Sequence, residues 1–263
     1  MHLPTKPARE RIFNVPPVLL GLVAALCVIH VVMVLLPTDD SDALLDLFAF
    51  DPLRYGASGA SWPGGLAADV WTFVTYAFLH FNWIHLGFNL IWLVAFGTPV
   101  ARRFGAWRFL AFFAFTAAAG ALAHLLSHIG ENVPAIGASA AVLGLMAAAL
   151  RFAFEPRGPL DPARLSEQDG YQVAAKPLVA MLRDRRMLLF LLGWLALSTV
   201  LARPEFAMPG VDAAVAWQAH IGGFVAGLIG FSAFDPLVPS PATQAGGSAQ
   251  GAAPSDDAAS DQQ

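Results

Sequence analysis

A serine, three histidines and an asparagine stand in parts of this sequence that are otherwise strongly apolar. They fall in three short motifs: His80-x4-His85-x3-Asn89, Gly137-x-Ser139 and Ala219-His220-x2-Gly223-x3-Gly227. Polar side chains are expensive in hydrocarbon, so those found in membrane segments usually face a bundle interior or a wet cavity. A hydroxyl and an imidazole in such a place indicate hydrolysis by an activated serine nucleophile.

The composition predicts that these motifs lie in a membrane. Hydrophobic residues make up 57% of the 263 residues and charged residues 13%, which is too apolar for an ordinary soluble domain. Six apolar stretches approach the length that crosses a hydrocarbon core of about 30 Å. They run over residues 18–36, 82–101, 106–127, 139–154, 187–202 and 217–234. We therefore expect an all-α polytopic membrane protein with six transmembrane helices.

The chain divides into one membrane domain and two tails. Residues 1–17 form a short basic tail, and residues 18–234 form the membrane domain. Residues 235–263 consist mainly of Ser, Pro, Ala, Gly, Gln and Asp, and a segment so poor in apolar residues is expected to be disordered. The first apolar stretch is longer than the ~7–15 apolar residues of a signal peptide, so we interpret it as a retained anchor.

Basic residues predict the orientation, because Lys and Arg collect on the cytoplasmic side of membrane proteins. Of the 15 Lys and Arg residues, all except Arg54 and Arg203 fall on the side that includes the N-terminus. Both termini should therefore be cytoplasmic; the expectation of a bacterial inner membrane rests on the family resemblance given below. The net charge of −4 is a sum over two opposed faces, so it implies no nucleic-acid partner, and we expect no cofactor or metal.

The spacing within the motifs suggests how they could act. His85 and Asn89 are four residues apart, so a helix places them on one face, where both can donate hydrogen bonds to one point. The alternative is that they bind a neighbouring helix. Ser139 begins an apolar run that spans about 24 Å as a helix, too short to cross fully. Ser139 then lies below the outer membrane surface, and the backbone before it is not helical. Non-helical backbone at that depth is tolerated only where it is buried inside the protein or lines a water-filled cavity. Its alternative role is a helix N-cap.

Small residues recur every fourth position in two of the stretches, at Ala140, Gly144 and Ala148 and at Ala219, Gly223 and Gly227. Such faces let helix backbones approach closely. If the two faces meet, the Ser139 hydroxyl lies beside the His220 imidazole, which can act as a general base. No Asp or Glu falls inside a predicted span, so the residues support a Ser–His dyad rather than a triad. The Ser139 backbone N–H, His85 and Asn89 could donate to an oxyanion.

These motifs, in this order along six helices, resemble the rhomboid intramembrane serine proteases across roughly residues 18–234. The resemblance implies a six-helix bundle whose cavity opens outward, and substrates that are transmembrane proteins cleaved near the outer membrane face. It also implies roles for six residues: Ser139 as nucleophile, His220 as its base, His85 and Asn89 as oxyanion donors, and His80 and Gly137 as supporting residues.

The chain departs from the common rhomboid pattern at four positions: Ala140 replaces a frequent glycine, Ala101 a frequent acidic residue, Thr72 a frequent arginine and Leu143 a frequent aromatic. These departures leave open a weak or inactive rhomboid-like protein that binds transmembrane helices, although the presence of both Ser139 and His220 argues against it. A transporter is disfavoured because no broken-helix repeat appears. Zinc and aspartyl proteases lack their motifs here. His30, in the first stretch, has no helical partner that would suggest a metal site, and no functional role is assigned to it.

Overall fold

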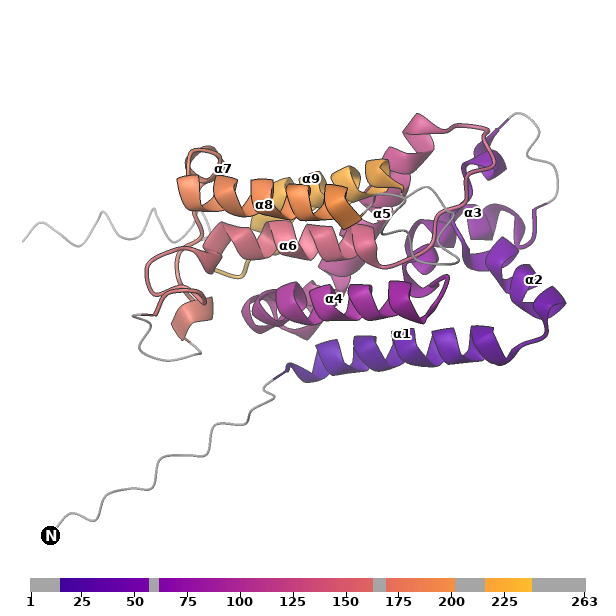
Figure 1. The fold of residues 1–263 in the computed structure, drawn as a ribbon, viewed down its shortest axis with the longest axis horizontal. Coiled ribbons are helices and arrows are strands. Elements are labelled where there is room, and N and C mark those ends of the chain that lie inside the picture. The colour runs from indigo at the N-terminus through magenta and orange to yellow at the C-terminus, as the bar shows by residue number, and fades with distance from the viewer. Residues whose placement is uncertain (1–14, 57–61, 163–168, 202–215, 238–263) are drawn as a thin grey trace, which may run out of the picture.

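The computed structural model describes residues 15–56, 62–162, 169–201 and 216–237, and these residues form helices joined by irregular segments (Figure 1). Helices cover the six predicted apolar stretches: α1 (Pro17–Leu35), α4 (Trp83–Phe104), α5 (Ala106–Ser127), α6 (Ser139–Ala153), α8 (Arg185–Leu201) and α9 (Trp217–Phe234). The largest boundary difference is at α4, which ends at Phe104 rather than at residue 101. Among the described helices, α1, α4 and α5 are long and apolar enough to cross a membrane, so the count of six spans stays a prediction.

Helix α6 is the centre of the bundle. Every residue from Ala140 to Ala153 is buried, as expected of a helix that is apolar on all sides. Figure 1 shows α6 between α4 on one side and α8 and α9 on the other, with α1 outside α4. Helices α5 and α9 also pack against each other. The N-terminal end of α6, where Ser139 stands, is therefore surrounded by other helices.

The two small-residue faces meet, as the sequence predicted. Gly223 of α9 lies so close to the backbone of Ala140 that a side chain at that position would overlap the Ala140 carbonyl. One turn further along, Gly227 lies against Gly144 in the same way. Helix α5 joins this contact because Gly120 accommodates the Ala140 methyl group. Ala140, which stands where rhomboid proteins often have glycine, therefore has room for its methyl group because the neighbouring helix has a glycine at position 120.

The 38–80 connection forms α2 (Thr38–Phe48), a 3₁₀ turn (Pro52–Tyr55), α3 (Gly65–Thr75) and a second 3₁₀ turn (Tyr76–Phe78). Arg54 holds this region together from inside. Its guanidinium is buried and donates to the backbone carbonyls of Asp46 and Pro63, both at 2.9 Å, and it pairs with Asp69 at 3.3 Å. The connection packs on the same end of the bundle as Ser139, where α3 contacts α5.

The opposite end of the bundle is fastened by a buried ion pair. Arg103 of α4 donates through Nε and Nη2 to the two carboxylate oxygens of Asp235, at 2.9 and 2.8 Å. Its Nη1 donates to the carbonyls of Tyr171 and Val173. The Arg103 and Asp235 side chains are 0% and 2% exposed. One guanidinium therefore joins α4 to the end of α9 and to the connector after α6. This connector includes a 3₁₀ turn (Asp169–Tyr171) and α7 (Leu178–Met181).

We expect Asp235→Ala to destabilise the bundle by about 3–5 kcal/mol, because it leaves the buried Arg103 charge without its partner. The measurement is the free energy of unfolding in mixed micelles, followed by circular dichroism. Arg108→Ala is the matched control, since Arg108 is exposed and its removal should change stability by less than about 0.5 kcal/mol. Equal stability of Asp235→Ala and wild type would contradict a structural role for the pair.

Candidate active site

Ser139 and His220 lie within hydrogen-bond distance although 81 residues separate them in the chain. The Ser139 Oγ is 2.7 Å from the His220 Nε2. Both side chains are half-buried, so the pair is not sealed from its surroundings. Ser139 is the first residue of α6, and the preceding cap position, Ala138, makes no side-chain cap hydrogen bond. Ser139 therefore does not act as an N-cap, because it is the first helical residue and its hydroxyl contacts His220 of α9.

The backbone before Ser139 is irregular, and neighbouring segments satisfy its hydrogen bonds. Ala135 exchanges two backbone hydrogen bonds with Phe50, at 2.8 and 3.2 Å, and the Gly137 N–H donates to the Tyr76 carbonyl at 2.9 Å. The Val133 carbonyl lies 2.8 Å from the His124 Nε2. Non-helical backbone at membrane depth requires partners of this kind, and together they fix the approach to Ser139.

Tyr76 is a site-supporting residue that the sequence did not single out. Its carbonyl accepts from Gly137, and its hydroxyl donates to the Ala117 carbonyl of α5 at 2.9 Å. It therefore links the segment before Ser139 to a helix beside it. A buried tyrosine needs a partner for its hydroxyl, but nothing in the local sequence predicts which carbonyl it reaches.

Gly137 leaves room for the ring of His85. Its φ of +119° lies in a region that favours glycine. A side chain at this position would collide with the His85 ring, its Cβ falling 2.6 Å from the His85 Cε1. The imidazole of His85 thus occupies the space that a side chain at residue 137 would take, two residues before Ser139.

The three polar residues of the first motif meet at the start of α4. Asn82 caps this helix, its Oδ1 accepting from the His85 N–H at 2.8 Å. The Asn89 Nδ2 donates to the His85 carbonyl at 2.9 Å, and since an amide carries two N–H groups, one stays available. The His80 and His85 ring centroids are 5.1 Å apart. The His80 Nε2 lies 3.5 Å from the backbone nitrogen of Ala138, which donates to it.

The N-terminal end of α6 offers further donors. The first N–H groups of a helix have no acceptor within the helix, and the helix dipole favours negative charge there. Ser139 is the first of these residues. An oxyanion that forms beside the Ser139 Oγ would meet a backbone N–H with the His85 ring nearby. Within the described residues, no three His, Cys, Asp or Glu side chains are arranged as metal ligands.

Known proteins are similar to parts of this chain. The rhomboid protease GlpG of Serratia proteamaculans is 31% identical over 91 residues, which cover 34% of this chain and 27% of that protein. The rhomboid protease GluP of Bacillus subtilis is 36% identical over 87 residues, covering 33% and 17%. Human rhomboid-related protein 3 is 32% identical over 97 residues, covering 37% and 24%. The chain thus spans about a quarter or less of the length of these relatives.

A family model of the Rhomboid domain matches residues 67–234. This range contains the three motifs as well as α4, α5, α6 and α9, the helices that carry and surround Ser139 and His220. The match extends over more than half of the 263 residues. The chain therefore belongs to the rhomboid family, as the order of its motifs predicted, and is an integral, multi-pass membrane protein.

Proposed function

We propose that this protein is an intramembrane serine endopeptidase in which Ser139 is the nucleophile and His220 its general base. The observation that carries the proposal is the 2.7 Å distance between the Ser139 Oγ and the His220 Nε2. Hydroxyls are poor nucleophiles until a base takes the proton, and this separation is the one that proton transfer requires. The names of the matched relatives, rhomboid proteases, support the same activity.

The reaction follows from the pair. The neutral His220 Nε2 takes the Ser139 proton while Oγ attacks the scissile carbonyl carbon and forms a tetrahedral oxyanion. The resulting imidazolium donates its proton to the leaving amine, the C–N bond breaks and an acyl-enzyme remains. His220 then deprotonates a water molecule that attacks the ester, and the proton returns to the Ser139 oxygen. Neither side chain is sealed from its surroundings, as this second, hydrolytic half requires.

The oxyanion would accept hydrogen bonds from the Ser139 backbone N–H, the His85 ring and the second N–H of Asn89. The Ser139 N–H is the first of α6, and the His85 ring lies against Gly137. Donors that are fixed before the reaction cost no reorganisation when charge develops, so they lower the barrier more than mobile ones. His80 supports this arrangement through the Ala138 N–H.

The proposed substrates are transmembrane proteins, cleaved near the outer membrane face. The bundle presents exposed apolar side chains along α1, α4 and α9, and an integral membrane enzyme meets membrane-embedded chains directly. The orientation we propose, with both termini in the cytoplasm of a bacterial cell, rests on the basic residues. It places Ser139, at the outer end of α6, on the extracytoplasmic side.

Labelling with a fluorophosphonate probe tests the dyad. Ser139 should react in the wild-type protein in bilayers, and Ser139→Ala and His220→Ala should each abolish labelling, because the nucleophile or its base is missing. Ser127→Ala and His128→Ala are matched controls near the end of α5, and both should label normally. Labelling that survives His220→Ala would mean that another group is the base. A folded wild type that neither labels nor cleaves any transmembrane substrate would indicate a helix-binding protein without catalysis.

Removing the side-chain donors tests the oxyanion assignment. His85→Ala and Asn89→Ala should each lower kcat, by up to the 10²–10³-fold order that loss of one oxyanion donor costs. KM for a transmembrane model substrate should change little, since the donors act on the transition state. Asn132→Ala, at an exposed position, is the control for a lost amide. Wild-type kcat in the His85→Ala/Asn89→Ala double variant would return both residues to the role of helix contacts.

A further inference from the structure

His30 of α1 is a buried histidine that the proposed reaction does not use. It is 1% exposed, and neither its Nδ1 nor its Nε2 has a hydrogen-bond partner among the described residues. The great majority of buried polar side-chain atoms in proteins are hydrogen-bonded. An unsatisfied one destabilises the folded state. A phenylalanine or leucine in this apolar helix would avoid that cost, so the imidazole calls for an explanation beyond packing.

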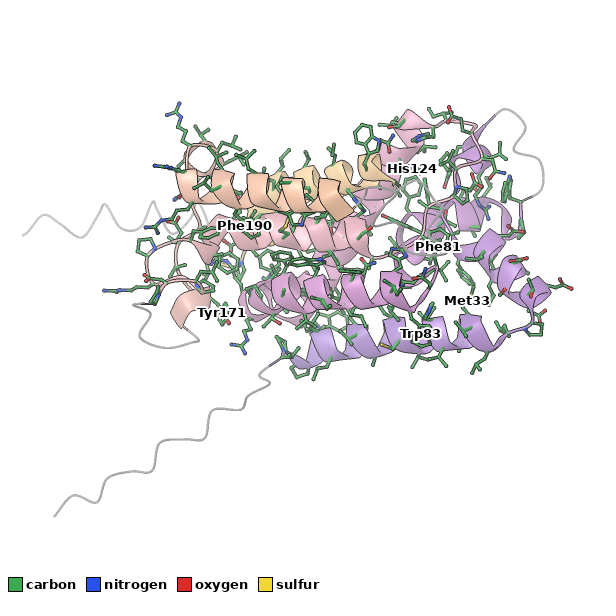
Figure 2. All side chains as sticks on the ribbon, in the orientation of Figure 1. Met33, Phe81, Trp83, His124, Tyr171 and Phe190 are labelled. Carbon is green, nitrogen blue, oxygen red and sulfur yellow. The ribbon has the colours of Figure 1, made fainter. Side chains whose placement is uncertain are left out.

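The surroundings of His30 lead to the candidate active site. Its ring meets the Trp83 ring edge-on, with the centroids 4.6 Å apart at an interplanar angle of 89°. It also lies beside the backbone carbonyl of His80, although short of hydrogen-bond geometry. Helix α1 packs against α4 and against the 3₁₀ turn Tyr76–Phe78, the two segments that flank His80 in the chain. Figure 2 shows Trp83 at the end of α4 that lies alongside α1.

His80 and His85 share the unusual property of His30. The Nδ1 atoms of both rings are buried and form no well-aligned hydrogen bond with the described residues, although the backbone carbonyl of Phe78 lies beside the His80 ring. Together with the two nitrogens of His30, four orphaned ring nitrogens belong to three neighbouring imidazoles. A neutral imidazole carries one donor and one acceptor, so such a group can be satisfied jointly by water. Buried water typically makes about three hydrogen bonds to polar groups of this kind.

The same histidines hold the backbone that carries the nucleophile. The other nitrogen of His80, Nε2, accepts from the Ala138 N–H at 3.5 Å. The His85 ring fills the space beside Gly137. Whatever fixes the orientation of these two rings therefore fixes residues 137 and 138, which directly precede Ser139. The His80 Nε2 can accept only in the tautomer that carries the ring proton on Nδ1, so an acceptor beside Nδ1 would stabilise this arrangement.

We propose that His30 is a positioning residue of the active site, which holds buried water together with His80 and His85 and so fixes these two rings behind Ser139. The inference rests on the proposed function for its effect on rate. His30 acts through the other two histidines and touches neither the substrate nor the reacting atoms. The water bonded to the His80 Nδ1 accepts its proton in a hydrogen bond, which leaves Nε2 as the acceptor for Ala138.

Kinetics on a transmembrane substrate in proteoliposomes form the first half of the test. His30→Phe keeps a flat ring against Trp83 but removes both nitrogens. Its kcat should fall about ten- to a hundredfold, the order that a small misplacement of a site costs, while KM stays unchanged. Its melting temperature should stay close to that of wild type, because an apolar ring of similar shape replaces a polar one whose partner was water. His30→Gln, which keeps a polar side chain, should recover most of the rate. Leu26→Met, a conservative core change on α1, is the control.

Wild-type kcat in a folded His30→Phe protein would overturn the proposal and leave His30 as a packing residue. A variant that loses kcat and stability in proportion, with no recovery in His30→Gln, would overturn it as well. If His30→Phe does not fold, the decision rests on His30→Gln and His30→Leu. The kcat of His30→Gln should stay within about threefold of wild type because its amide can still hold water, whereas the kcat of a folded His30→Leu variant should fall; equal kcat values for the two variants would overturn the proposal.

The second half does not depend on activity, so failure of the inference can be told from failure of the proposed function. Nitrogen-15 spectra of the histidine rings are recorded in the Ser139→Ala background, with and without His30→Phe. The ring resonances of His80 and His85 should shift, and their cross-peaks to water should weaken, while those of His124 stay in place. An inactive wild type whose resonances shift in this way would reject the protease but keep the histidine cluster. Unshifted His80 and His85 resonances would reject the cluster whatever the activity.

Discussion

The close approach of two helix backbones is the constraint on which the rest of this structure depends. Gly223 lies against the Ala140 carbonyl and Gly227 against Gly144, with no room for a side chain at either glycine. In lipid no hydrophobic force draws helices together, so close packing of small residues must do so. This contact brings α6 and α9 near enough for an imidazole on one to reach a hydroxyl on the other at 2.7 Å.

The second requirement is that the start of α6 be held in place, because the backbone before it is irregular. Phe50 and Tyr76 accept or donate its hydrogen bonds, and the His85 ring fills the space beside Gly137. At the far end of the bundle the Arg103–Asp235 pair fixes the ends of α4 and α9. The rigid helices, these hydrogen bonds and the ion pair together define the position of Ser139. A loop alone would not hold it as firmly.

The sequence predicted the helices that matter and the residues that meet, because both follow from local patterns. Apolar runs gave the extents of α1, α5 and α9 closely, and the four-residue spacing of Ala140 and Gly144 gave the face that meets α9. The Arg103–Asp235 ion pair could not be predicted from the sequence, because 132 residues separate its two members. Each charged residue, taken with its sequence neighbours alone, is typical of a surface position. His30 received no functional role from the sequence, because nothing near it in the sequence reveals three neighbouring imidazoles with unsatisfied nitrogens.

The most direct test of the account is the rate at which a fluorophosphonate labels Ser139 as the side chain at position 223 grows, from Gly to Ala to Val. A side chain at this position pushes α9 away from α6, so the labelling rate should fall stepwise, by about a hundredfold or more for Gly223→Val, with Ser139 and His220 both present. Gly21→Val, at a position with nothing within 4 Å, should label at the wild-type rate. A folded Gly223→Val protein that labels as fast as wild type would show that the α6–α9 contact does not bring Ser139 and His220 together.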